Sequence, residues 1–338
     1  MDMSFNEEWL VQSSSYSDVM NSTVLPWLKN KASSSVVSGY DGHPLHCETY
    51  QAEKPVATVF FVHGFTENTV KYAELIWSAL HLGFSVVIYD QRGHGLSWRD
   101  PGVSHHSVTH IDHFEDYVRD LRIICDACRG IMPEPWFVFA HSMGGAVASL
   151  FLEQEKNVFR AAVLSSPMIA PDTGGVPASV ASALAFLAGI IGKGKNNPFF
   201  LRPYSGPEDF STSCATDPSR FFWYDSLKAS EPVYQNSVPS YRWSYESIQV
   251  TRKILASGAP EKINCPVLLF SAGMDHSVRN GPQAEFVRRI PGGIHVAEPQ
   301  ARHEIYRSVN EVLFPWWHKV IAFYRKNVTP CGSEGDGQ

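Results

Sequence analysis

Short apolar runs alternate with longer mixed stretches along most of the chain. Continuous apolar runs bounded by Gly, Pro or polar clusters predict buried strands, and the longer stretches predict helices. The expected strands cover 56–62, 84–89, 136–139, 161–167, 263–271 and 294–296, and the expected helices cover 70–82, 113–128, 146–152 and 309–326. Residues 36–50 predict a hairpin around Asp41-Gly42. Strands that alternate with helices predict an α/β fold, with a mostly parallel central sheet flanked by helices.

The alternation stops between residues 168 and 258, where prolines and aromatic residues are frequent. A structureless loop of that length is implausible in a compact domain, so we expect an inserted, mainly helical cap or lid over 168–258. The core is then expected to comprise 36–167 and 259–328. Residues 1–35 are predicted to form a Ser-rich leader, helical or irregular, and residues 329–338 a loose polar tail.

One segment of the expected cap, Val176 to Ile191, is apolar on all sides rather than on one stripe. The favoured interpretation is a helix buried under the cap. The alternative is a lid surface that contacts lipid, because exposed apolar patches mark such contacts. No apolar stretch reaches the roughly 18 residues of a membrane-spanning helix.

Composition narrows the function. The 338 residues are 44% hydrophobic with a net charge of −6, and no basic block is present, so a nucleic-acid role is not expected. Residues 1–8 are acidic and lack an apolar run, which argues against a secretory signal peptide. Six cysteines in such a chain are expected to be reduced thiols in the cytoplasm. Cys125 and Cys128 form one C-x-x-C pair without a second pair, so no metal site is expected.

The most informative stretch is Trp136 to Gly145, which joins a predicted strand to a predicted helix through Ala-His-Ser-Met-Gly-Gly. Strand, sharp turn and helix with Ser at the apex is the nucleophile elbow of the α/β-hydrolase fold. The strained turn leaves room only for small residues two positions before and after the serine, here Ala140 and Gly144. The usual first residue of that motif is Gly, and Ala is small enough to replace it. Ser142 is therefore predicted to be the nucleophile.

Two further reactive side chains follow predicted strands, in the order that the fold requires. Asp275 comes after the strand that ends near Ser271, and His303 precedes the last helix. The order Ser, acid, His predicts a triad in which His303 is the base and Asp275 orients it. His276 and His295 are weaker rivals to His303, and Asp275 could instead be a turn residue.

The oxyanion hole requires backbone N–H donors close to the nucleophile. Met143, directly after Ser142, and Phe65, after His63-Gly64, are predicted to supply them. Glu67 lies close to that loop and is a candidate to touch substrate, although a solvated loop residue is the favoured interpretation. Among the cap aromatics, Trp243 and Phe221 are candidates to line an acyl channel. His63, His94 and Asp90 are interpreted as residues that shape loops.

Several segments give the chain a resemblance to a known family. They are Val70–Leu75, His81–Phe84, Asp90–Ser97, Phe114, Asp116–Val118, Ala140–Ala146, Ser166–Met168, Tyr241, Trp243, Glu246–Ser247 and His303–Glu304. On these segments the chain resembles the α/β-hydrolases of the monoacylglycerol lipase and lysophospholipase group, with the bacterial PldB-type lysophospholipases most similar.

The resemblance implies hydrolysis of the single acyl ester of a lysophospholipid without metal or cofactor, and peripheral attachment to the inner face of the cytoplasmic membrane. A monoacylglycerol lipase or general carboxylesterase with the same triad is the alternative. A serine aminopeptidase and a non-catalytic binding protein of the same fold are more remote possibilities, because the first needs an acidic patch and the second a missing triad member.

Overall fold

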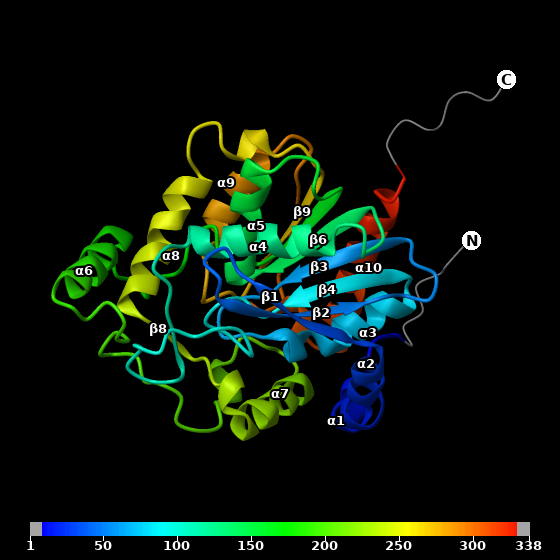
Figure 1. Cartoon of the computed structure of the whole chain (residues 1–338), viewed down its shortest axis with the longest axis horizontal. Coiled ribbons are helices and arrows are strands. Elements are labelled where there is room, and N and C mark those ends of the chain that lie inside the picture. Colours follow the sequence, from blue (N-terminus) through cyan, green and yellow to red (C-terminus); the bar gives the residue numbers. More distant parts are fainter. Residues whose placement is uncertain (1–8, 330–338) are drawn as a thin grey trace.

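The computed structural model describes residues 9–329 and is built around one eight-stranded sheet (Figure 1). The strand order is β1-β2-β4-β3-β6-β7-β9-β10, with β2 antiparallel to both neighbours and all other pairs parallel. The strands are β1 (Ser33–Ser38), β2 (Pro44–Tyr50), β3 (Ala57–Val62), β4 (Phe84–Tyr89), β6 (Trp136–His141), β7 (Ala161–Ser165), β9 (Val267–Ala272) and β10 (Ile294–Glu298). The predicted α/β fold, the hairpin and each predicted strand are confirmed.

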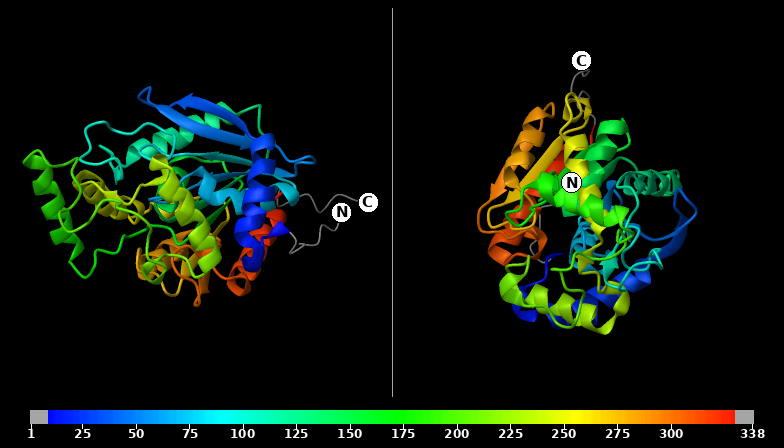
Figure 2. Two further views of the ribbon diagram at one scale, coloured as in Figure 1. Left: turned by 90° about the horizontal axis from the view of Figure 1, so that it is seen from below. Right: turned by 90° about the vertical axis from the view of Figure 1, so that its left-hand side faces the viewer.

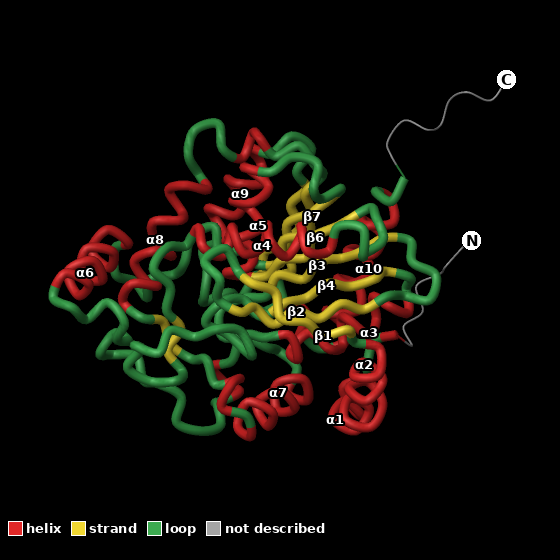
Figure 3. The backbone as a smooth tube through the Cα atoms, viewed as in Figure 1, coloured by secondary structure: helices red, strands yellow, loops and turns green. Residues whose placement is uncertain are grey.

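Helices cover both faces of the sheet (Figures 1 and 3). Strands β3, β4 and β6 are buried on both faces, which is why their sequences are predominantly apolar rather than alternating. Phe60 and Phe61, consecutive in β3, belong to opposite core layers. The helices of the core are α3 (Ala73–His81), α4 (Glu115–Cys128), α5 (Ser142–Gln154), α9 (Asn280–Arg289) and α10 (Asn310–Lys326).

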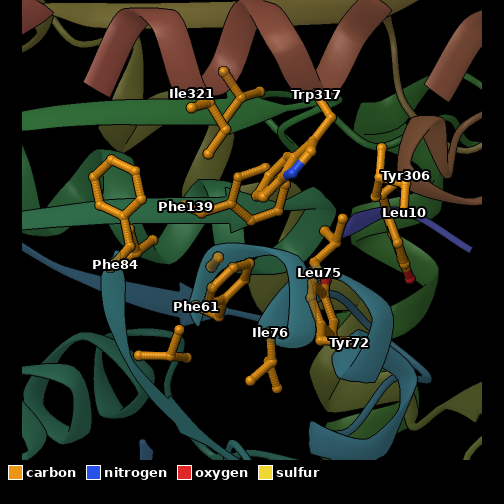
Figure 4. Packing of buried hydrophobic residues seen from close by; sticks show 14 of the residues in the cluster. Leu10, Phe61, Tyr72, Leu75, Ile76, Phe84, Phe139, Tyr306, Trp317 and Ile321 are labelled. Atoms are coloured by element: carbon orange, nitrogen blue, oxygen red, sulfur yellow. The ribbon is translucent and has the colours of Figure 1, made fainter. Parts of the chain in front are cut away.

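One core layer lies between the sheet and α3 and α10 (Figure 4). Side chains from three strands meet those of both helices there: Phe61, Phe84, Phe139, Leu75, Ile76, Trp317 and Ile321. The other layer packs the opposite sheet face against α4, α5 and α9. The two layers hold the ends of β3, β6 and β9 in fixed positions, and the predicted site residues Phe65, Ser142 and Asp275 follow these ends.

Residues 9–32 are integrated into the core rather than forming a separate leader. They carry α1 (Tyr16–Val19), a π-helical turn and α2 (Leu25–Lys31), and Met20 and Val24 are fully buried. Strand β1 begins at Ser33, before the expected boundary at residue 35. Helical turns cover most of this described part. The expected tail falls outside the described residues except for Thr329.

The chain between β7 and β9 carries α6 (Ala178–Ile190), α7 (Pro218–Ser230), α8 (Tyr241–Ile254) and the two-residue strand β8 (Val238–Pro239), which pairs with β5 (Val108–Thr109). This mainly helical content agrees with the expected insertion, whose limits stay predictions. Helix α7 packs against α1, whereas α6 forms one extremity of the molecule (Figures 1 and 2).

The structure corrects the favoured interpretation of residues 176–191. Only Ser182, Ala185 and Ala188 of α6 are buried. The large apolar side chains are instead exposed: Val176, Val180, Leu184, Phe186, Leu187, Ile190 and Ile191, with Phe199 and Phe200 on the following loop. Helix α6 packs chiefly on α8, through small residues, so its larger side chains face outward.

Candidate active site

Ser142 lies at the apex of a sharp turn between β6 and α5. Its φ is +51°, a backbone conformation that residues other than Gly seldom adopt. Close packing around the turn explains the neighbouring glycines. A Cβ on Gly144 would lie 2.1 Å from the Val62 carbonyl oxygen, and one on Gly145 would lie 2.5 Å from the Pro167 Cβ. The predicted nucleophile elbow is therefore present. Gly144 and Gly145 must be small because a Cβ at either position would clash with its neighbours.

Ser142, His303 and Asp275 form one hydrogen-bonded chain, although they are far apart in sequence. The distance from the Ser142 Oγ to the His303 Nε2 is 2.8 Å, and that from the His303 Nδ1 to the Asp275 Oδ2 is 2.7 Å. A carboxylate only accepts, so the Nδ1 carries the proton and the Nε2 accepts from the serine hydroxyl. Ser142 remains 8% exposed. This arrangement can activate a hydroxyl for attack on an acyl carbonyl.

Asp275 is held as a carboxylate. Burial alone would raise the pKa of Asp275, but the hydrogen bond and charge of His303 and the N–H groups of Ser277 and Val278 lower it below its ordinary value. The two N–H groups bond to Oδ1 and leave Oδ2 directed at the imidazole. The carboxylate therefore fixes both the orientation and the tautomer of His303.

Phe65 and Met143, the predicted oxyanion donors, both lie close to Ser142. Neighbouring Gly64 already uses its N–H on Glu67 and its carbonyl on His63, whereas the Phe65 N–H has no acceptor among residues 9–329. A Cβ built on Gly64 would lie 3.0 Å from the Ser142 Cβ, so this loop borders the nucleophile. Met143 is in the first turn of α5, where N–H groups lack helical acceptors. The assignment of both N–H groups as oxyanion donors stays a prediction.

Glu67 is buried and hydrogen-bonded to protein groups, which corrects the expectation of a solvated loop residue. Its side chain is 1% exposed. It accepts hydrogen bonds from the Gly64 N–H and from the hydroxyls of Tyr72 and Tyr306. Sequence reasoning missed these partners and Lys71. Only the Glu67–Lys71 spacing of four residues hints at the ion pair.

The two cap aromatics differ in position. The ring of Trp243, on α8, packs against the Phe65 ring with centroids 4.3 Å apart, so it borders the oxyanion loop. Phe221, on α7, is 3% exposed and packs against Phe210 and Phe222. Phe221 therefore packs in the interior of the cap, whereas we expected it to line an acyl channel.

The residues interpreted as loop-shaping have that role. The His63 Nε2 accepts the Gln91 N–H, and the His94 Nδ1 lies 3.1 Å from the Arg92 carbonyl. Asp90 accepts N–H groups from Thr69 and Leu96. Of the rival histidines, His295 is exposed on β10 and contacts Ser271 rather than packing inward.

We next searched the described residues for a metal site and for a membrane-spanning helix. Cys125 and Cys128 are buried free thiols in α4. Across residues 9–329 no group of three His, Cys, Asp or Glu side chains is arranged to hold a metal ion. Over the same range, no helix combines the length and apolarity needed to cross a membrane.

Comparison with known proteins agrees with this geometry. The profile of the family described as "Serine aminopeptidase, S33" matches residues 53–310. The chain belongs to this family. It is 29% identical to lysophospholipase L2 of Escherichia coli strain K12 over 314 residues, which cover 88% of each chain. It is 31% identical to mouse monoglyceride lipase over 131 residues, 38% of this chain and 41% of the relative.

The fold likeness extends to solved structures. A soluble variant of monoglyceride lipase from Saccharomyces cerevisiae superposes with a TM-score of 0.67 at 19% identity, over 88% of this chain and 96% of that one. The predicted α/β-hydrolase fold and the resemblance to the monoacylglycerol lipase and lysophospholipase group are confirmed.

Proposed function

We propose that this protein is a serine hydrolase that cleaves the single acyl ester of lysophospholipids through an acyl-enzyme intermediate. The observation that carries the reaction type is the hydrogen-bonded chain from Ser142 through His303 to Asp275. Similarity to lysophospholipase L2 over 88% of the chain supports the substrate class.

Each residue of the site has a distinct role in the proposed ester hydrolysis. The Ser142 Oγ attacks the ester carbonyl carbon while its proton passes to the His303 Nε2. The negative oxygen of the tetrahedral intermediate is bound by the N–H groups of Phe65 and Met143, at the N-terminus of α5. His303 then gives its proton to the leaving glycerol oxygen as the C–O bond breaks. Water, deprotonated by His303, releases the fatty acid and restores Ser142.

A monoacylglycerol lipase with the same triad is the second candidate, supported by the similarity to mouse monoglyceride lipase. The two substrates carry the same scissile bond and differ in the headgroup. A serine aminopeptidase is less well supported, because it needs a free acid to hold the substrate amine. Glu67 and Glu304, the carboxylates beside the triad, are buried and paired with Lys71 and Arg307.

We further propose that α6 attaches the enzyme peripherally to the cytoplasmic membrane surface. Residues 176–192 carry no charged side chain, and Leu184, Leu187 and Ile190 are each more than half exposed. An exposed apolar helix of this kind is typical of interfacial contact rather than of a span. The cap would then contact the layer from which a lipid substrate leaves.

The test compares fatty-acid release from a lysophospholipid, a monoacylglycerol and a short-chain nitrophenyl ester. We expect preference for the lysophospholipid in the wild type and loss of all three activities in Ser142→Ala. Ser149→Ala is the matched control, because Ser149 lies in the same helix and its hydroxyl only bonds to the Gly145 carbonyl. Preference for the monoacylglycerol would replace the lysophospholipase assignment, and activity retained in Ser142→Ala would refute the mechanism.

A further inference from the structure

A buried cluster of charged residues lies beneath the oxyanion loop, and the reaction scheme above does not use it. The Glu67 Oε2 accepts the Gly64 N–H at 2.5 Å and the Tyr72 hydroxyl at 2.6 Å, while its Oε1 accepts the Tyr306 hydroxyl at 2.5 Å. The Lys71 Nζ lies 3.4 Å from the Glu67 Oε1 and 2.6 Å from the Glu304 Oε1. The carboxylate of Glu67 therefore has a full set of donors.

The same cluster reaches the triad and the cap. Glu304 follows His303 directly, and its Oε2 accepts from the Arg307 Nη1 at 2.7 Å. The Arg307 Nη2 donates to the Arg220 carbonyl in α7 at 2.7 Å. One network thus joins the oxyanion loop, the segment that carries the base, and the cap helix that packs on the N-terminal segment.

The oxyanion loop needs such an anchor because its backbone is strained. Thr66 has a φ of +62°, an unfavourable value for a β-branched residue, and it separates Phe65 from Glu67. Strained conformations persist where surrounding contacts over-determine them. Glu67 holds the Gly64 N–H, and the His63 Nδ1 lies 2.8 Å from the Gly64 carbonyl, which shares a peptide unit with the Phe65 N–H. The two contacts on Gly64 together orient the Phe65 N–H.

The groups around Glu67 favour an ionised carboxylate at this position. Burial raises the pKa of Glu67, but His141, Lys71 and the Tyr306 hydroxyl act in the opposite direction and keep it well below its usual range. Burial also disfavours the charge of Glu304, yet Lys71 and Arg307 lower its pKa too. A buried carboxylate is tolerated only when paired and hydrogen-bonded, and here both conditions are met.

We propose that Glu67 is a positioning residue for catalysis: its ionised carboxylate, paired with Lys71, holds Gly64 so that the Phe65 N–H points at the oxyanion. This inference rests on the proposed hydrolase function and deepens it. Gln at this position is nearly isosteric, but one of its two terminal atoms becomes a donor. That amide then meets either the Gly64 N–H or the Lys71 ammonium, so the donor set no longer fits.

The experiment measures kcat and KM for a soluble short-chain ester in Glu67→Gln, together with inhibition by a trifluoromethyl ketone that forms a tetrahedral adduct with Ser142. We expect kcat to fall at least about tenfold and ketone affinity to fall in parallel, because one oxyanion donor is misdirected. The KM should stay within about threefold of wild type, because the ground-state carbonyl uses the hole less.

Glu48→Gln is the matched control. Glu48 also accepts a tyrosine hydroxyl, that of Tyr50, and its pKa is also lowered, by the hydrogen bonds of His46 and Tyr50 against the effect of burial, but it lies on β2. We expect its kcat within about twofold of wild type. If Glu67→Gln does not fold, Tyr306→Phe removes a single donor to the Oε1 and should lower kcat about threefold at unchanged KM.

The outcomes separate the two proposals. An inactive wild type would contradict the proposed function itself. An active wild type that requires Ser142, with unchanged kcat and ketone affinity in Glu67→Gln, would overturn the positioning role alone. A rise in KM at constant kcat would also overturn it, because Glu67 would then act on substrate binding.

Discussion

Gly144 is the position in the elbow where close packing most clearly excludes any residue larger than Gly. A Cβ at this position would lie 2.1 Å from the Val62 carbonyl oxygen and 2.5 Å from that of His63. Both oxygens belong to the backbone at the end of β3, so neither can rotate away. The substitution Gly144→Ala must push the end of that strand away from α5.

The size of the effect follows from this displacement. The shorter contact has to lengthen by about 1 Å, and a misplacement of about 1 Å in a catalytic group lowers the rate about 100-fold. The moved segment leads into Gly64 and Phe65, so the oxyanion donor shifts with it. Overpacking lowers the free energy of unfolding by about 1–3 kcal/mol. The higher helix propensity of Ala relative to Gly raises it by about 1 kcal/mol. We expect a net loss of about 0–2 kcal/mol in the free energy of unfolding.

The assay compares kcat/KM on a soluble ester with thermal unfolding followed by circular dichroism. Gly281→Ala is the matched control, since Gly281 is also near the start of a helix, α9, and a Cβ there meets no atom within 4 Å. We expect Gly281→Ala to keep full activity and a slightly higher melting temperature. Gly144→Ala with activity within about threefold of wild type would refute the packing argument.

Three other substitutions follow from the structure. Asp275→Asn should lower kcat about 10⁴-fold in ester hydrolysis because the amide favours the wrong tautomer of His303; a loss below about tenfold would contradict the triad. Burial raises the pKa of Glu153 to about 8, so the folded state binds a proton that the unfolded state releases, and stability should fall as pH rises from about 4.5 to 8. Glu153→Gln should flatten this fall and raise the melting temperature at pH 8 by about 2 °C, after allowance for partial exposure; an unchanged pH dependence in calorimetry would contradict it. Replacing Leu184 and Leu187 by Ser should abolish sedimentation with phospholipid vesicles, whereas Val36→Ser, an exposed apolar position on β1, should not; equal binding by all variants would exclude α6 as the contact.

The core of the fold is predictable from sequence because its central strands are predominantly apolar. The runs at 57–62, 84–89 and 136–141 are buried on both faces, so composition alone locates them. The triad was also predictable from sequence, because the elbow motif is local and the acid and the base each follow a strand. Their contact depends only on the rule that parallel strands end at one edge.

The parts that sequence reasoning got wrong depend on contacts between distant segments. The apolar composition of α6 does not state which side is covered, and the answer depends on its packing against α8 through small residues. Glu67 resembles a solvated loop residue in sequence because one of its partners, Tyr306, lies 239 positions away. The buried role of residues 9–32 likewise arises from packing against α3 and α7.

Covalent labelling tests the central claim most directly. A fluorophosphonate probe reacts only with an activated serine, and peptide mass spectrometry identifies the labelled position. We predict labelling of the wild type at Ser142, slower labelling of His303→Ala, and none in Ser142→Ala. Labelling at another serine, or a wild type that stays unlabelled while correctly folded, would contradict the assignment of this protein as a serine hydrolase acting through Ser142.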